Sequence, residues 1–77
     1  MKNLILSIVT PIVDYPDEVR VREVEEDQRI TYHLSVHERD IGKVIGRHGR
    51  VAKAIRTVVY AAAGLKQHKK VYMEIDE

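Results

Sequence analysis

The stretch KVIGRHGRVAKAIR, Lys43 to Arg56, decides the fold because two glycines three residues apart separate two apolar repeats. The repeat before Gly46 predicts a short helix, and the repeat after Gly49 predicts a longer helix that begins near Arg50. Gly46 can take the positive φ that reverses a chain, and Gly49 leaves no side chain where another backbone approaches. The stretch is therefore a turn between helices and a candidate phosphate-binding loop.

The start of the longer helix supplies the chemistry of such a loop. Amides in the first turn of a helix lack partners and lie at the positive end of its dipole, so they can donate to phosphate oxygens. Arg47 and Arg50 add charge there, and Arg47 and His48 lie at the tip of the turn. Because glycines at this spacing arise by chance in many chains, the prediction depends more on the helix start and its charge.

Charge is divided along the chain in a way that the net value of +1 hides. Residues 39–70 contain nine lysines and arginines and one acid, Asp40, which gives +8. The remaining residues contain four basic and eleven acidic side chains, which gives −7. This asymmetry indicates a polyanionic partner for the basic segment, although charge runs are also common on solvated helix faces.

Length and composition predict one small domain, residues 1–77, whose core holds by apolar burial alone. Cys, Trp and Phe are absent, so there is neither a disulfide nor a thiolate metal site, and nothing argues for an oxidising compartment. The apolar stretch LILSIVTPIV, residues 4–13, is too short to span a membrane and lacks a cleavage site. We therefore expect a cytoplasmic protein.

The first half of the chain predicts a helix and a β-hairpin. Apolar spacing predicts an amphipathic helix over Lys2–Val13 that bends or loosens at Pro11, and Asp14–Glu18 reads as a turn. Residues 19–24 and 30–36 alternate as two strands joined by the polar link 25–29. The alternation of the first strand slips near its end, which predicts a bulge there.

The second half predicts two helices and a last strand. A short helix starts at Glu38 and Asp40, whose acids suit its positive end, and stops at the first glycine of the loop. A long helix follows to Gly64, which we expect just beyond its end in the left-handed conformation, and residues 70–75 alternate as a strand. The expected buried stripe of the long helix is Val51, Ile55, Val58, Val59 and Ala62.

The order helix, strand, strand, helix, helix, strand predicts an α+β fold in two layers. The first two strands form an antiparallel hairpin, and the connection of the second strand to the last through two helices favours a parallel crossover. We therefore expect a three-stranded mixed sheet covered on one face by three helices.

Three segments carry a resemblance to a known family: DIGKVIG, HGRVAKAIRTVV and AAAG, residues 40–46, 48–59 and 61–64. They resemble KH domains, and nearly all of the chain resembles the small bacterial single-KH proteins of the KhpA type, with a type II order of elements. The resemblance implies a fold that clamps about four nucleotides of single-stranded RNA or DNA, with the backbone on the Gly-x-x-Gly loop and the bases over an apolar groove.

Position by position, the resemblance implies three groups of binding residues. The loop comprises Gly46, Arg47, His48 and Gly49. The residues that line or support the groove are Ile41, Val44, Ile45, Val51 and Val36. The basic rim comprises Lys43, Arg50, Lys53 and Arg56. His48 stands where the family more often has an uncharged polar residue or glycine, and this departure implies loop affinity that depends on pH. The alternative is an exposed histidine that is mostly neutral at pH 7, which is the commoner outcome.

The resemblance also implies partners beyond RNA. It implies self-association and pairing with a second, larger KH protein of the Jag/EloR type, in RNA chaperoning or post-transcriptional regulation tied to cell growth or envelope synthesis. The tyrosines at positions 15, 32, 60 and 72 do not cluster near the loop in sequence, so no aromatic stacking platform is predicted. Modest affinity of one copy makes a dimer a sensible route to useful binding by linked sites.

The alternative is a protein-interaction module, for dimerisation or as an adaptor, in which nucleic-acid binding is weak or secondary. The apolar first helix and the alanine-rich third helix are its candidate surfaces. The apolar stripe of the third helix is more simply explained as core, whereas Tyr60 and Ala63 fall off that stripe and remain candidates for an interface.

Neither a metal site nor catalysis is predicted. His33 and His37 are four residues apart on a strand, about 13 Å, which is too far for two ligands of one zinc ion. The serine and threonine hydroxyls have no setting typical of an activated nucleophile, and the acids at positions 14, 17 and 18 show no metal-loop pattern. We therefore predict a non-catalytic protein without a cofactor.

Overall fold

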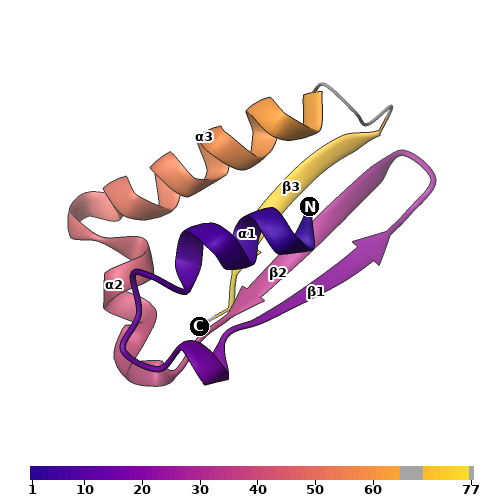
Figure 1. Cartoon of the computed structure of the whole chain (residues 1–77). Coiled ribbons are helices and arrows are strands. Elements are labelled where there is room, and N and C mark those ends of the chain that lie inside the picture. The colour runs from indigo at the N-terminus through magenta and orange to yellow at the C-terminus, as the bar shows by residue number, and fades with distance from the viewer. Residues whose placement is uncertain (65–68, 77) are drawn as a thin grey trace.

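The computed structural model describes residues 1–64 and 69–76 as three helices and three strands (Figure 1). The predicted order of elements is confirmed, and short 3-10 turns precede β1, α2 and α3. Lys66 of the basic segment lies outside the described residues. The bounds are α1 Lys2–Val9, β1 Arg20–Glu25, β2 Arg29–Ser35, α2 Ile41–Ile45, α3 Arg50–Gly64 and β3 Lys70–Ile75.

The sheet has the order β1-β2-β3, with β1 antiparallel and β3 parallel to the central strand, as predicted. The predicted bulge in β1 is wrong, because its six residues pair one to one with β2, from Arg20 with Ser35 to Glu25 with Ile30. The slip in alternation has another cause: Val21 and Val24 point to opposite faces of the sheet, and Val24 is 37% exposed.

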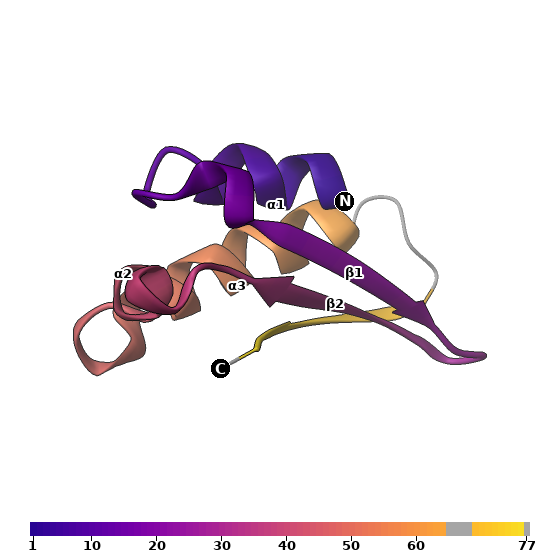
Figure 2. The same ribbon diagram turned by 90° about the horizontal axis from the view of Figure 1, so that it is seen from below.

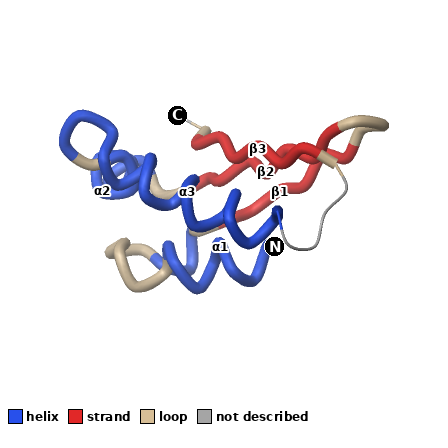
Figure 3. Tube along the Cα trace, turned by 90° about the horizontal axis from the view of Figure 1, so that it is seen from above, coloured by secondary structure: helices blue, strands red, loops and turns tan. Residues whose placement is uncertain are grey.

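The helices and the sheet form two layers. In Figures 2 and 3, α1 and α3 lie on one side of the sheet, and α2 lies beyond the end at which β2 finishes. The core between the layers draws on every helix and strand except β1, whose Val21 packs against it half-buried. Its buried members are Ile5, Val9, Val13, Val19, Ile30, Tyr32, Leu34, Val44, Ile55, Val59 and Met73.

Two helix ends differ from the prediction. The first helix stops at Val9, four residues early, because Pro11 has no amide to continue the hydrogen-bond ladder. Val13 still reaches the core from the following turn. Gly64 is the last residue of α3 and does not have the positive φ expected of it. The helix extends through this glycine, which is as compatible with helical φ as with positive φ.

The buried face of α3 is rotated from the predicted stripe. Its buried residues are Ala52, Ile55, Val59 and Ala63. Val58 is 48% exposed, so the prediction that it lies in the core is wrong. Ala63, which was expected off the stripe, is buried. Alanines allow α3 to lie close to the sheet, which turns the larger Val51 and Val58 toward α1.

Candidate nucleic-acid interface

The loop between α2 and α3 is a tight turn with three positive φ angles. Gly46 has φ 74° and ψ 176°, His48 has φ 58° and ψ 25°, and Gly49 has φ 73°. The positive φ of His48 was not predicted, although histidine is one of the few residue types enriched in the left-handed region. The Gly49 N–H donates to the Gly46 carbonyl at 3.2 Å, which closes the turn around Arg47 and His48.

The two glycines are needed for different reasons. A Cβ on Gly46 would lie 2.3 Å from Cγ2 of Val51, so this glycine lets the loop pack against α3. Among the residues that the structure describes, nothing lies within 4 Å of the position that a Cβ on Gly49 would take. Gly49 therefore leaves an open surface at the start of α3, as a site for an approaching backbone requires.

The amides of the turn differ in their hydrogen bonds. The Arg50 N–H donates to the Arg47 carbonyl, so this amide at the start of α3 is engaged. The amides of Arg47 and His48 lie inside the turn and outside its closing hydrogen bond. Both side chains are exposed, as expected at the tip. The loop therefore presents two successive amides flanked by Arg47 and Arg50, an arrangement that can receive a phosphate.

The four residues of the predicted basic rim are not equivalent. Lys43 forms an ion pair with Asp14, whose carboxylate accepts a hydrogen bond from the ammonium and raises the pKa of Lys43. Arg56 is half-buried, and its Nε donates to the Met73 carbonyl at 3.1 Å. Arg50 and Lys53 are exposed on α3 beside the loop.

The predicted groove residues divide into support and surface. Val44 is fully buried in the core, so it can hold the groove in place but cannot line it. The other four, Ile41, Ile45, Val51 and Val36, are half-buried and offer partial apolar surface. Val51 also borders the flank of α3 that faces α1.

Asp40 holds the short helix α2 in place in a way that the sequence analysis missed. Its side chain is fully buried and accepts the N–H groups of Asp14 at 3.1 Å and Tyr15 at 3.0 Å. The Tyr15 ring also stacks on His37, with centroids 4.0 Å apart. The sequence marked Asp40 only as an acid at a helix start, since its partners are 25 and 26 residues away.

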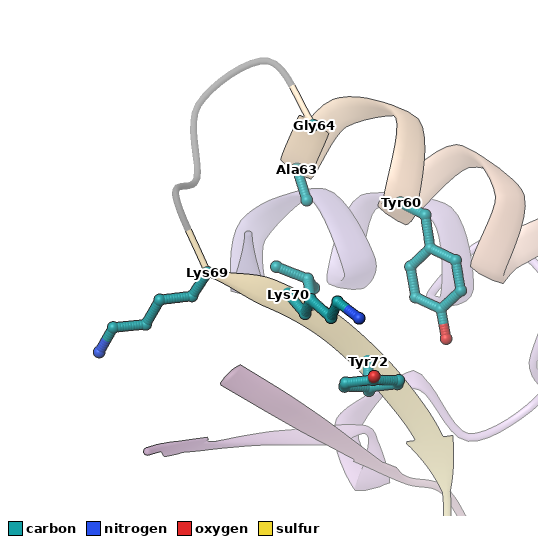
Figure 4. Close-up of a pocket in the computed structure, with 7 residues that line it drawn as sticks. Tyr60, Ala63, Gly64, Lys69, Lys70 and Tyr72 are labelled. Carbon is teal, nitrogen blue, oxygen red and sulfur yellow. The ribbon is translucent and has the colours of Figure 1, made fainter. Parts of the chain in front are cut away.

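The two flanks of α3 carry different surfaces. Between α1 and α3 runs an apolar groove of about 330 Å³, which we call the α1–α3 groove, lined by Ile8, Ile12, Arg50, Val51, Ala54, Ile55 and Val58. Between α3 and the edge strand lies a pocket of about 370 Å³, which we call the α3–β3 pocket, lined by Tyr60, Ala63, Gly64, Lys69, Lys70, Val71 and Tyr72 (Figure 4).

The two residues expected off the stripe of α3 both face the sheet. The Tyr60 hydroxyl accepts the Met73 N–H at 3.2 Å, and Ala63 is 3% exposed. Ala63 therefore contributes to the core, and Tyr60 to the α3–β3 pocket.

Two further site types are not found in the part of the chain that the structure describes. Among residues 1–64 and 69–76, no three His, Asp or Glu side chains gather in a way that could hold a metal ion. Within the same ranges, no helix has the length and apolar character needed to cross a bilayer.

The fold and the loop together define a KH domain of the type II arrangement. An antiparallel hairpin, a helix-loop-helix crossover with glycines at both ends of its turn, and a parallel third strand give this class of domain. The family model described as KhpA/KhpB, KH domain, matches residues 2–75. The chain belongs to this family.

Curated relatives match over nearly the full chain. The RNA-binding protein KhpA of Bacillus subtilis is 57% identical over 97% of this chain and 91% of its own length. The RNA-binding protein KhpA of Oceanobacillus iheyensis is 53% identical over 97% and 99%. That of Listeria monocytogenes is 54% identical over the whole of both chains. Membership of a family of KH-domain proteins named for RNA binding confirms the prediction of a non-catalytic protein.

Solved structures support the fold alone. Aquifex aeolicus Era bound to GDP and AlF4⁻ matches 96% of this chain with a TM-score of 0.73 at 18% identity. Era in complex with MgGDPNP and nucleotides 1506–1542 of 16S ribosomal RNA matches 97% of it with a TM-score of 0.63 at 14% identity. The chain spans 28% and 30% of those two Era chains.

Proposed function

We propose that residues 1–77 act as one KH domain that binds a short stretch of single-stranded RNA and catalyses no reaction. We also propose that the protein is cytoplasmic. The turn at Gly46–Gly49 carries the proposal, because it combines two amides outside its closing hydrogen bond with exposed basic side chains. The relatives' name, RNA-binding protein, supports RNA as the ligand. Single-stranded DNA shares the same phosphate chemistry and is the comparison ligand.

In this proposal the loop holds the RNA backbone and the half-buried apolar residues receive the bases. The Arg47 and His48 amides donate to a phosphate, and the charges of Arg47, Arg50 and Lys53 hold its neighbours. Bases lie over the partial apolar surface of Ile41, Ile45, Val51 and Val36, which Val44 supports from the core. Lys43 and Arg56 complete the rim from positions already engaged with Asp14 and Met73.

The test is a charge reversal of the loop. In Arg47→Asp/His48→Asp, affinity for short single-stranded RNA should fall at least about tenfold, because the charge of Arg47 is lost and two carboxylates beside the loop amides repel the phosphate. Asn3→Asp/Arg22→Asp makes the same change in net charge at exposed positions of α1 and β1 and should retain binding. Circular dichroism checks both folds, and wild-type affinity should fall as salt rises. Unchanged RNA binding by the loop variant would mean that the loop is only a turn.

Self-association is part of the proposal. The α1–α3 groove is lined almost entirely by apolar side chains, and Ile12 and Val58 within it are 36% and 48% exposed. A second copy that covers this groove would remove the exposed surface of these two side chains from water. It would also bring two RNA-binding protein loops into one dimer. The groove is also the specific observation in favour of a protein-interaction role, which a dimer reconciles with RNA binding.

The family description supports a proposal about the partner and the process. We propose that the protein also pairs with a second KH protein of the Jag/EloR type and acts in post-transcriptional regulation, including RNA chaperoning. A family description that joins KhpA with KhpB supports such pairing. Crosslinking of bound RNA in cells, with the loop variant as control, identifies the targets. Loss of the crosslinked RNAs in the variant is the expected result.

A further inference from the structure

The α3–β3 pocket combines two tyrosines with two lysines at the edge of the sheet. Tyr60 and Tyr72 are 38% and 40% exposed, which is high for such large apolar rings. Figure 4 shows the Lys70 side chain extending between these two rings, whereas that of Lys69 points away from the pocket. The pocket therefore offers aromatic surface and one ammonium group together.

Contacts around the pocket hold the rings in place, and two of the nearby acids are paired with cations. The hydrogen bond from the Met73 amide fixes Tyr60, and the guanidinium of Arg29 lies 5.8 Å from the centroid of the Tyr72 ring. Lys69 is paired with Glu25 at 2.7 Å, and Arg29 with Glu26 at 2.9 Å. These pairs offset part of the negative charge that would repel a phosphate from Lys70, whereas Glu74, which lines a neighbouring pocket with Tyr72, stays exposed.

One side of α3 connects the loop to this pocket. Lys53, Arg56 and Tyr60 follow the spacing i, i+3 and i+7, so they lie along one side of the helix. Contacts of Arg56 and Tyr60 with Met73 place this side against β3. The rise from Arg50 to Tyr60 is about 15 Å at 1.5 Å per residue. A strand held at the loop can therefore follow basic side chains to the pocket.

We propose that the α3–β3 pocket is a second subsite for the RNA strand bound at the loop. A base stacks on Tyr72, and Lys70 contacts an adjacent phosphate. Charged grooves with aromatic platforms hold single strands in this way, with little dependence on sequence. The inference rests on the proposed RNA binding at the loop and extends the bound stretch beyond the roughly four nucleotides of a single KH groove. It also reverses the expectation that the tyrosines form no stacking platform.

The test compares fluorescently labelled random-sequence RNA pools of four and ten nucleotides. A ten-nucleotide strand offers more registers to the loop site alone, so the length effect itself does not decide the matter. The deciding quantity is the effect of variants on each pool. In Tyr72→Thr, which removes the ring but keeps a residue suited to a strand, affinity for the ten-nucleotide pool should fall about tenfold. Affinity for the four-nucleotide pool should stay within twofold.

Matched variants separate the two parts of the subsite. Tyr72→Phe keeps the ring and should bind both pools as wild type does. Lys70→Gln should weaken the long pool alone and lower the slope of log affinity against log salt by about one. Lys2→Gln makes the same charge change on α1 and should alter neither pool. Thermal melting checks that each variant is folded.

Failure of this inference and failure of the proposed function give different results. If Tyr72→Thr and Lys70→Gln bind the long pool as wild type does, or weaken both pools equally, the second subsite is wrong while the loop site stands. If wild type binds neither pool, or Arg47→Asp/His48→Asp binds both unchanged, the proposed function itself is wrong and the subsite falls with it.

Discussion

The two flanks of α3 differ in chemistry although they belong to the same fifteen-residue helix. The flank toward α1 borders a groove lined by Val51, Ala54 and Val58, with Arg50 as its one charged residue. The flank toward β3 carries Lys53, Arg56 and Tyr60 and leads to the α3–β3 pocket. One helix therefore offers an apolar surface suited to a protein and a basic, aromatic surface suited to a nucleic acid.

This separation reconciles the two functions that the sequence left as alternatives. A second copy on the apolar flank would not cover the basic flank, because the buried residues of α3 lie between them. The two proposed surfaces share Arg50 and Val51, which line the α1–α3 groove and also belong to the RNA site. Substitutions away from these two residues, such as those at Val58 and Lys53, should therefore remove one property without the other.

The largest expected effect is at Gly46, in the loop that precedes α3 and packs against it. Gly46→Ala should lower the free energy of unfolding by about 3 kcal/mol, because of its positive φ and the clash with Val51. Gly49→Ala should lower it by about 1 kcal/mol, since only the φ is unfavourable. Gly42→Ala, in helix α2 with open space around it, should raise it by roughly 0.5 kcal/mol. Urea unfolding measures the series, and an equal loss for the variants at 46 and 49 would contradict the packing argument.

The next largest effect should come from a substitution that disrupts self-association through the apolar flank and leaves RNA binding intact. Val58→Asp should weaken self-association about a hundredfold or more, because dimerisation would bury an unpaired carboxylate. Its affinity for a four-nucleotide RNA should not change. Ala61→Asp adds the same charge at an exposed position of α3 outside the groove lining and should leave the dimer intact. Sedimentation across a concentration series measures the dimer. A wild-type protein that stays monomeric at high micromolar concentration would refute self-association.

The smallest effect should come from the loss of one charge on the basic flank, which should weaken RNA binding alone. Lys53→Gln removes an exposed charge between the loop and the pocket and should weaken RNA binding by less than about tenfold, lowering the salt slope by about one. Self-association should be unaffected. Binding titrations at several salt concentrations provide the measurement. A change in dimer stability with intact RNA binding would show that the flanks have been assigned the wrong way round.

Periodicity predicted the elements of this fold better than it predicted which face of each element is buried. The strands followed from alternation of apolar and polar residues, and the loop followed from the glycines; both are local signals. The stripe of α3 was predicted one position out at both ends, with Val51 in place of Ala52 and Ala62 in place of Ala63, and it wrongly included Val58. Both spacings fit a helix, and only the sheet selects between them. The bulge in β1 was predicted from the one position, Val24, whose apolar side chain faces away from the core.

The binding surfaces depend on contacts between residues far apart in sequence. Tyr60 and Tyr72 meet in one pocket because β3 returns beside α3, which no local pattern shows. The Arg56 side chain could be counted as a basic group, but its bond to Met73 depends on the same packing. The loop residues, by contrast, are contiguous, and the sequence placed Arg47 and His48 correctly at an exposed tip.

The contacts of Asp40 imply an order in which the segments of this domain fold. The five-residue helix α2 is far shorter than the roughly 12 residues that an isolated helix needs to persist in water. It is held by the backbone of Asp14 and Tyr15, a segment that the ribosome makes first. The turn that follows α2 can therefore take its shape only after the amino-terminal segment has docked. A chain that presents this loop has already brought together segments 25 and 26 residues apart.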